Sequence, residues 1–240
     1  VPGDCSKLSW EYATCSGGKG TCVIGLDNTP ICTNCIVDPN KGQFEYSGPT
    51  CGQKLYPVPA YKMDDPTVPE TEKILVPGKK YISGDHFGQS NSVALEPGEW
   101  SYFLVNTRNE YNSLSFQLKI ENTELVQRSG VLSPILLVKP ADSGAALPSL
   151  STDPKTLFDF EGSKLGEQIV TIEGSASQPI SARYYVAVYN QRYSGAALEY
   201  KVIVSSTKKS VVSYSCLNNN YFLSFLLKCT IIFIFFFILT

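Results

Sequence analysis

Hydrophobic and polar side chains alternate along several segments between residues 74 and 206. In LSFQLKIE (residues 114–121), leucine, phenylalanine and isoleucine occupy every second position, and polar residues occupy the positions between them. The same period of two recurs in EYKVIVS (residues 199–205). Successive side chains of a strand point to opposite faces, so this period is typical of a half-buried β-strand. The pattern therefore predicts a series of strands in this zone.

Two other segments are apolar without interruption. RYYVAVYN (residues 183–190) carries aromatic or aliphatic side chains at both odd and even positions, so we expect both faces of that strand to be covered. PILLVK (residues 134–139) is a short apolar run, as expected of a central strand. Turn sequences such as VPGKK and YSGAA separate the strands. The prediction is a mainly-β protein with an antiparallel β-sandwich over residues 74–206.

The chain of 240 residues divides into further zones around this sandwich. Residues 1–51 are rich in cysteine and turn-forming residues. Residues 52–73 hold four prolines and no sustained apolar pattern, which predicts a stiff, partly extended linker. Residues 207–220 form a mostly polar spacer, and residues 221–240 are strongly apolar. The chain starts at Val1 rather than at methionine, as expected of a processed form or a fragment.

Charge and cysteine placement limit the class of protein. The chain has 20 basic and 22 acidic residues, which gives no basic face for nucleic acid. Six of its eight cysteines fall within fifty residues, in a segment too short to be stabilised by apolar burial alone. Such a segment depends on disulfides, which persist in oxidising compartments. We therefore expect this region to face the secretory lumen or the cell exterior.

Cysteine spacing alone leaves the pairing open, since six cysteines allow 15 pairings. A zinc site is disfavoured because only Cys32 and Cys35 have the two-residue spacing, and the single histidine, His86, lies beyond the proline-rich segment. A phosphate-binding loop is disfavoured because the lysine of GGKGT is followed by glycine rather than by serine or threonine. No cofactor or metal is expected.

One stretch resembles a known family. CSGGKGTC (residues 15–22) is similar to the loop between the second and third cysteines of epidermal growth factor (EGF)-like modules, with Gly20 two positions before the third cysteine. We expect its glycines to supply tight turns with positive φ and Lys19 to be an exposed side chain. Asp4 stands alone before the first cysteine, so the calcium-binding form of the family is not expected. The resemblance implies the pairing Cys5–Cys22, Cys15–Cys32 and Cys35–Cys51.

The second domain loosely resembles the pre-peptidase C-terminal type of β-sandwich, in LEPGEWSYFLV (residues 95–105) and in the paired segments ARYYVAVYN and LEYKVIV. Domains of that type are non-catalytic accessories, so the resemblance implies a binding or stabilising role. His86 lies beside Asp85, with Ser83 and Ser90 near, but no G-x-S-x-G or H-E-x-x-H motif occurs. We expect His86 in a solvated turn, no catalytic residue and no enzymatic activity.

Five tyrosines near the end of the sandwich offer two interpretations. They could form a platform that stacks on sugars, or most of them could fill the core and its rim, and the second interpretation is favoured. The residues are Tyr184, Tyr185, Tyr189, Tyr193 and Tyr200.

The apolar tail, residues 221–240, would span about 30 Å as a C-terminal hydrophobic helix, enough to cross a bilayer core. Three explanations stay open: a transmembrane anchor or the first of several spans, a glycosylphosphatidylinositol attachment signal, or a translated non-coding segment. Cys216 and Cys229 fit none of the pairings of the N-terminal cysteines.

Together these features predict a non-enzymatic extracellular recognition or adhesion domain, attached to a membrane through residues 221–240 and binding a protein or glycan. Two alternatives are an accessory region of a larger multi-span membrane enzyme or receptor and a secreted carbohydrate-binding protein.

Overall fold

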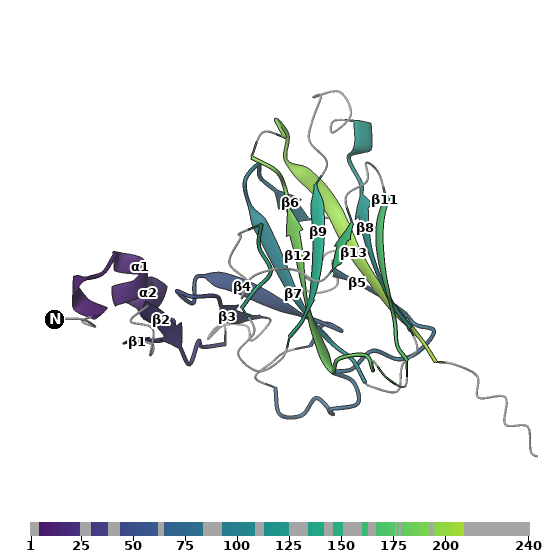
Figure 1. The fold of residues 1–240 in the computed structure, drawn as a ribbon, viewed down its shortest axis with the longest axis horizontal. Coiled ribbons are helices and arrows are strands. Elements are labelled where there is room, and N and C mark those ends of the chain that lie inside the picture. Colours follow the sequence, from purple (N-terminus) through teal and green to yellow (C-terminus); the bar gives the residue numbers. More distant parts are fainter. Residues whose placement is uncertain are drawn as a thin grey trace, which may run out of the picture. The chain divides into compact units, whose positions relative to one another are not determined.

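The computed structural model gives the arrangement of most of the chain (Figure 1). Residues 1–209 form one compact unit. The residues that the structure describes are 5–24, 30–37, 44–61, 65–83, 93–108, 113–124, 134–141, 146–150, 160–162, 167–175, 177, 179–192 and 194–208. The segment for which the C-terminal hydrophobic helix is expected, residues 221–240, lies outside the described residues.

The helices whose full extent is described lie near the N-terminus, and strands follow. The helices are η1 (Cys5–Lys7), α1 (Trp10–Ala13) and α2 (Cys15–Gly18). The strands are β1 (Thr21–Ile24), β2 (Pro30–Thr33), β3 (Glu45–Ser47), β4 (Gln53–Val58), β5 (Lys80–Ile82), β6 (Val93–Leu95), β7 (Trp100–Asn106), β8 (Ser113–Ile120), β9 (Ile135–Pro140), β10 (Phe160–Gly162), β11 (Glu167–Glu173), β12 (Arg183–Tyr189) and β13 (Leu198–Thr207). The prediction of a mainly-β protein is confirmed.

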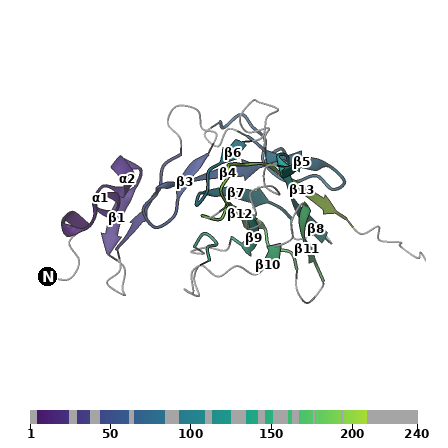
Figure 2. The same ribbon diagram turned by 90° about the horizontal axis from the view of Figure 1, so that it is seen from above.

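Two large sheets lie in separate layers, as Figure 2 shows from above. The six-stranded sheet has the order β10-β9-β12-β7-β4-β3, and the five-stranded sheet contains β11-β8-β13-β5, with β6 also paired to β13. Neighbouring strands are antiparallel except for β4 and β7, which are parallel. Strands β1 and β2 form a separate two-stranded hairpin. The arrangement is sandwich-like, as the alternation predicts.

The largest hydrophobic cluster draws side chains from both large sheets. In β8 the even-numbered residues are at most 5% exposed and contribute to this cluster, so the alternation read in LSFQLKIE is confirmed. Buried side chains of β7, β9 and β12 reach it from the six-stranded sheet. The cluster includes Phe103, Val105, Leu114, Phe116, Leu118, Leu136, Val138, Tyr184, Val186, Val188, Tyr200, Val202 and Val204.

A second hydrophobic cluster is formed by the other face of the six-stranded sheet. It contains Leu55, Tyr102, Leu104, Leu137 and Ala187, together with Leu147 from the segment that follows β9. Strands β9 and β12 therefore bury side chains on both faces, because odd-numbered residues belong to this cluster and even-numbered ones to the first. The expectation that both faces of residues 183–190 are covered is confirmed.

The segment expected to be a linker, residues 52–73, contains strand β4. The first half of β4 pairs with β3. The second half of β4 pairs with β7, from Leu55↔Tyr102 to Val58↔Val105. Pro57 is tolerated because β3 pairs only as far as Leu55, so beyond that point no described residue pairs through its backbone with that side of the strand. Leu55 and Val58 of β4 are buried, one in each of the two clusters. Pro57 thus lies in a strand of the six-stranded sheet rather than in an isolated extended spacer, whereas Pro59, Pro66 and Pro69 follow that strand.

Candidate functional site

Disulfides form the interior of the N-terminal module, by which we mean the described residues between 5 and 51. Cys15, Cys32 and Cys51 are at most 4% exposed and form a cluster with Cys22, Cys35 and Tyr46. The three disulfides join Cys5 to Cys22, Cys15 to Cys32 and Cys35 to Cys51, which is the pairing that the EGF resemblance implies. Their Cα–Cα distances are 6.2, 5.7 and 5.5 Å.

The glycine-rich loop CSGGKGTC uses its glycines in two ways. Gly17 and Gly18 have φ of +87° and +86°, so the expectation of tight turns with positive φ is confirmed for them. The amide of Gly17 also donates a 3.0 Å hydrogen bond to the Thr14 hydroxyl. Gly20 instead lies against the neighbouring disulfide, because a Cβ atom there would be 2.5 Å from Cys51 Sγ and 2.9 Å from the carbonyl oxygen of Thr33.

The expectation that Lys19 is an exposed side chain is wrong. Lys19 is half-buried, and its Nζ lies 4.4 Å from the centre of the Tyr46 ring. Its carbonyl oxygen accepts a 2.9 Å hydrogen bond from the amide of Ile36. The loop therefore contacts residues beyond its own disulfides, and Lys19 contributes a cation–π interaction rather than a free charge.

Large apolar side chains are exposed on the surface of the module. Val23 and Ile31 are directly opposite each other on β1 and β2 and are 38% and 43% exposed. They face away from the disulfides because Cys22 and Cys32 occupy the other face of the same hairpin. Trp10 is 63% exposed. We take Trp10, Val23 and Ile31 as the candidate site and call them the apolar surface of the module.

Sequence reasoning did not single out these three residues, although a signal for two of them exists. In TCVI and PICT the cysteines must face the disulfide interior, and the residues next to them in a strand then face outward. That argument needs the two segments to be strands, which neither apolar alternation nor length indicates.

The tyrosines considered as a sugar platform are divided between different environments. Tyr184 and Tyr200 are at most 3% exposed in the main core, and Tyr193 lies outside the described residues. Tyr189 is half-buried and stacks on Trp100, with ring centres 4.4 Å apart. Trp100 also stacks with Tyr102 at 5.8 Å. These rings pack on one another, so they form an aromatic ladder within the sheet face rather than a row of open ring faces.

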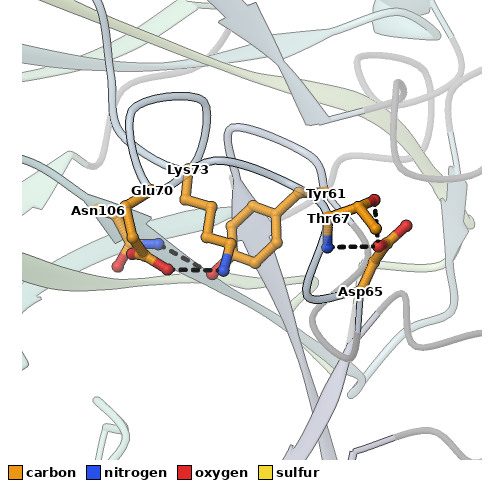
Figure 3. Close-up of polar contacts among 6 residues, drawn as sticks. All are labelled: Tyr61, Asp65, Thr67, Glu70, Lys73 and Asn106. Atoms are coloured by element: carbon orange, nitrogen blue, oxygen red, sulfur yellow. Dashed lines mark hydrogen bonds and ion pairs between the residues drawn. The ribbon is translucent and has the colours of Figure 1, made fainter.

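A polar cluster fixes the segment between β4 and β5 to the end of β7 (Figure 3). Asn106 Nδ2 donates to the Tyr61 hydroxyl over 3.2 Å, and Lys73 Nζ lies 5.7 Å from the centre of the Tyr61 ring. Lys73 also forms a 2.7 Å ion pair with Glu70. Farther along the segment, the amide of Leu75 donates to the carbonyl oxygen of Asn106. Burial raises the pKa of Tyr61, so its hydroxyl stays neutral and acts as a hydrogen-bond partner.

One carboxyl group is held in an unusual electrostatic environment. Glu45 on β3 is half-buried, and burial raises its pKa, while the positive charge of Arg183 lowers it to a smaller extent. Burial also raises the pKa of Tyr185, and the negative charge of Glu45 adds to this effect. The carboxyl therefore holds its proton to higher pH than an exposed glutamate does.

Several residues singled out in the sequence cannot be placed in a site. His86, Asp85 and Ser90, with Cys216 and Cys229, lie outside the described residues. Ser83 is 5% exposed, and its hydroxyl accepts a 3.0 Å hydrogen bond from the amide of Val202. In the part of the chain that the structure describes, no group of three or more histidine, cysteine or acidic side chains could hold a metal ion. Each helix of that part is also too short to cross a membrane.

Comparisons with known proteins add little. No family model and no curated protein matches the sequence. Among solved structures, one match is PliG of Aeromonas hydrophila, described as a periplasmic lysozyme inhibitor of g-type lysozyme. The match has 12% sequence identity and a TM-score of 0.33, and it covers 56% of this chain and 96% of that chain. A structural likeness this weak supports no conclusion about the fold or the function of this chain.

The three disulfides indicate an extracellular or secreted location.

Proposed function

We propose that the chain is a non-enzymatic extracellular recognition region, attached to a membrane through residues 221–240, and that its EGF-like N-terminal module binds a partner protein through the apolar surface. The observation that carries this proposal is the exposure of Trp10, Val23 and Ile31 on a segment held together by three disulfides. Support for the EGF-like assignment comes from the disulfide pairing and from the close approach at Gly20.

The physical argument concerns what stabilises the module. Its interior is made of cystines, so Val23 and Ile31 are not needed to build a core and remain on the outside. A disulfide-bonded hairpin holds its side chains in fixed positions before a partner arrives, which lowers the entropic cost of binding. Tryptophan is among the residues that contribute most to protein–protein binding energy. A fixed hairpin with an aliphatic pair and an exposed tryptophan is therefore well suited to protein recognition.

Adhesion of coated beads tests the recognition role. Beads coated with the full chain in lipid are added to a panel of cultured cells and to purified matrix proteins. We expect adhesion to a member of the panel that is lost when Ile31→Asp is combined with Trp10→Ser. Val76→Asp is the matched control, because Val76 is an exposed aliphatic residue outside the module. Absence of adhesion to every surface, or equal adhesion by the double variant, contradicts the proposal.

Membrane attachment is tested separately on cells that express the full chain. We expect the protein to stay in the membrane pellet after extraction at alkaline pH and to enter the medium when residues 221–240 are deleted. Release by a phosphatidylinositol-specific phospholipase identifies a lipid anchor, and resistance identifies a peptide span. Recovery of the full chain in the medium contradicts attachment and leaves the recognition role to be judged by the bead assay.

A further inference from the structure

Strand β11 is the longest edge strand among the described strands. It ends the five-stranded sheet and pairs with β8 over seven residues, from Glu167↔Lys119 to Glu173↔Ser113. The other edge strands of the two large sheets are β3, β5, β6 and β10, each of three residues, and the two strands of the β1–β2 hairpin have four residues each. Short edge strands are a common protection against unwanted pairing, and β11 lacks that protection.

The outer edge of β11 also lacks the usual chemical protections. Its sequence, EQIVTIE, contains no lysine and no proline, and its register with β8 is continuous, without a bulge. Among the residues that the structure describes, β11 pairs through its backbone with β8 alone. Alternate residues of such a strand direct their N–H and C=O groups away from the sheet, where another strand can pair with them.

The outer face of β11 presents an aliphatic side chain that an added strand would cover. Ile169 on β11 is 53% exposed. It lies opposite Gln117 on β8, which in turn lies opposite Ile203 on β13. An aliphatic residue on an added strand would cover Ile169. On the inner face, Gln168 is 1% exposed and donates from Nε2 to the carbonyl oxygen of Pro134. Its Oε1 is buried and accepts no hydrogen bond within the described structure.

The glutamates at the two ends of β11 indicate which kind of strand can pair with its edge. A second copy that paired antiparallel over the whole strand, centred on Val170, would place Glu167 opposite Glu173 twice. Like charges directly opposite each other in a sheet are destabilising. We propose that the β11 edge binds an extended segment of a partner protein as an added antiparallel strand, with lysine or arginine opposite Glu167 and Glu173 and an aliphatic residue opposite Ile169. The proposal uses other residues than the apolar surface of the module, so the two are tested independently.

A designed peptide serves as the probe. KVTVISK, paired antiparallel, places lysines opposite the two glutamates, isoleucine opposite Ile169 and serine opposite Gln168. Cells that display the full chain are stained with streptavidin tetramers of the biotinylated peptide, since multivalency compensates for the weak binding of one short strand. We expect staining by KVTVISK and none by EVTVISE. Ile169→Lys is expected to abolish staining, because an edge lysine opposes strand addition.

A charge exchange separates pairing from loss of folding. Glu173→Lys should weaken staining by KVTVISK by about fivefold, as expected when an attractive cross-strand pair becomes repulsive, and should create staining by EVTVISK, whose first residue lies opposite position 173. Glu72→Lys, at an exposed glutamate outside β11, should leave staining by KVTVISK unchanged. Absence of staining by KVTVISK, or no gain for EVTVISK with Glu173→Lys, overturns the proposal. Clustering of displayed chains that Ile169→Lys abolishes would identify a second copy as the occupant and also overturns it.

Discussion

Replacing Gly20 by alanine tests whether the module depends on the close approach at that residue. The new Cβ would lie 2.5 Å from Cys51 Sγ and 2.9 Å from the carbonyl oxygen of Thr33, both far inside van der Waals contact. Neither atom can move easily, because the sulfur is bonded to Cys35 and the oxygen belongs to the backbone of β2. The backbone of the loop or of the hairpin must therefore shift.

The expected loss of stability from Gly20→Ala can arise by either of two routes. Overpacking of a well-packed interior costs about 1–3 kcal/mol, and contact with a backbone oxygen favours the upper end. If the strain instead prevents closure of the Cys35–Cys51 disulfide, the loss is about 3 kcal/mol, since the disulfide closes a loop with a sequence separation of 16. Both routes predict destabilisation of the module by about 3 kcal/mol.

Two glycines provide controls for this substitution. Gly52→Ala would bring a Cβ to 3.0 Å from Ser16 Oγ and 3.1 Å from Thr50 Oγ1, which are side-chain atoms that can rotate away. We expect it to cost roughly 0.5 kcal/mol. Gly18→Ala meets nothing within 4 Å but keeps a positive φ, so about 1 kcal/mol of backbone strain is expected.

The measurement combines stability with disulfide formation. Thermal unfolding of the purified full chain is followed together with mass-spectrometric counting of alkylated thiols before reduction. We expect Gly20→Ala to lower the unfolding midpoint of the module or to leave Cys35 and Cys51 open to alkylation, and the two controls to do neither to a comparable degree. A Gly20→Ala protein with three closed disulfides and the stability of Gly52→Ala would refute the reasoning.

Two further predictions concern the six-stranded sheet. Burial raises the pKa of Glu45, so the folded state binds its proton more tightly than the unfolded state does, and stability should fall as pH rises from the ordinary carboxyl pKa through the raised value. Glu45→Gln should flatten this part of a stability–pH profile measured by denaturant unfolding, and an unchanged profile would contradict the assignment. Asn106→Ala removes the donor to the Tyr61 hydroxyl and should cost about 1 kcal/mol. Hydrogen exchange should show this as faster exchange in residues 65–76. Asn122→Ala, which removes side-chain hydrogen bonds to Ala197 and Glu199 instead, should leave that segment unchanged.

The sequence predicts strands well where one face is buried and the other is not. Residues 114–121 alternate because β8 lies between β11 and β13 with one face in the core. The apolar runs of β9 and β12 were also interpretable, because both strands are central and bury both faces. In these segments the local pattern and the tertiary environment agree, which is the condition under which periodicity is informative.

Strand β4 could not be found in this way. Its partner β7 is separated from it by more than forty residues, and no local signal specifies a parallel pairing at that distance. Pro57 and Pro59 argue for a linker, and Pro57 is compatible with the sheet because no described strand pairs with β3's side of β4 beyond Leu55. The module presents a related difficulty. The pairing of its cysteines came from a family resemblance, and neither the contact of Lys19 with Tyr46 nor the exposure of Trp10 has a signature in the spacing.

The two parts of the chain are stabilised by different means, and this difference bears on where binding can occur. The sandwich buries most of its large apolar side chains in two clusters, and the surface proposed there for recognition is the edge of β11, the longest edge among the described strands. The module is held by cystines, so its aliphatic and aromatic side chains are free to face outward. A reducing environment would therefore affect the two proposed surfaces differently. Recognition through Trp10 and Ile31 should be lost with the disulfides, whereas strand addition at β11 depends on the sandwich core and should persist.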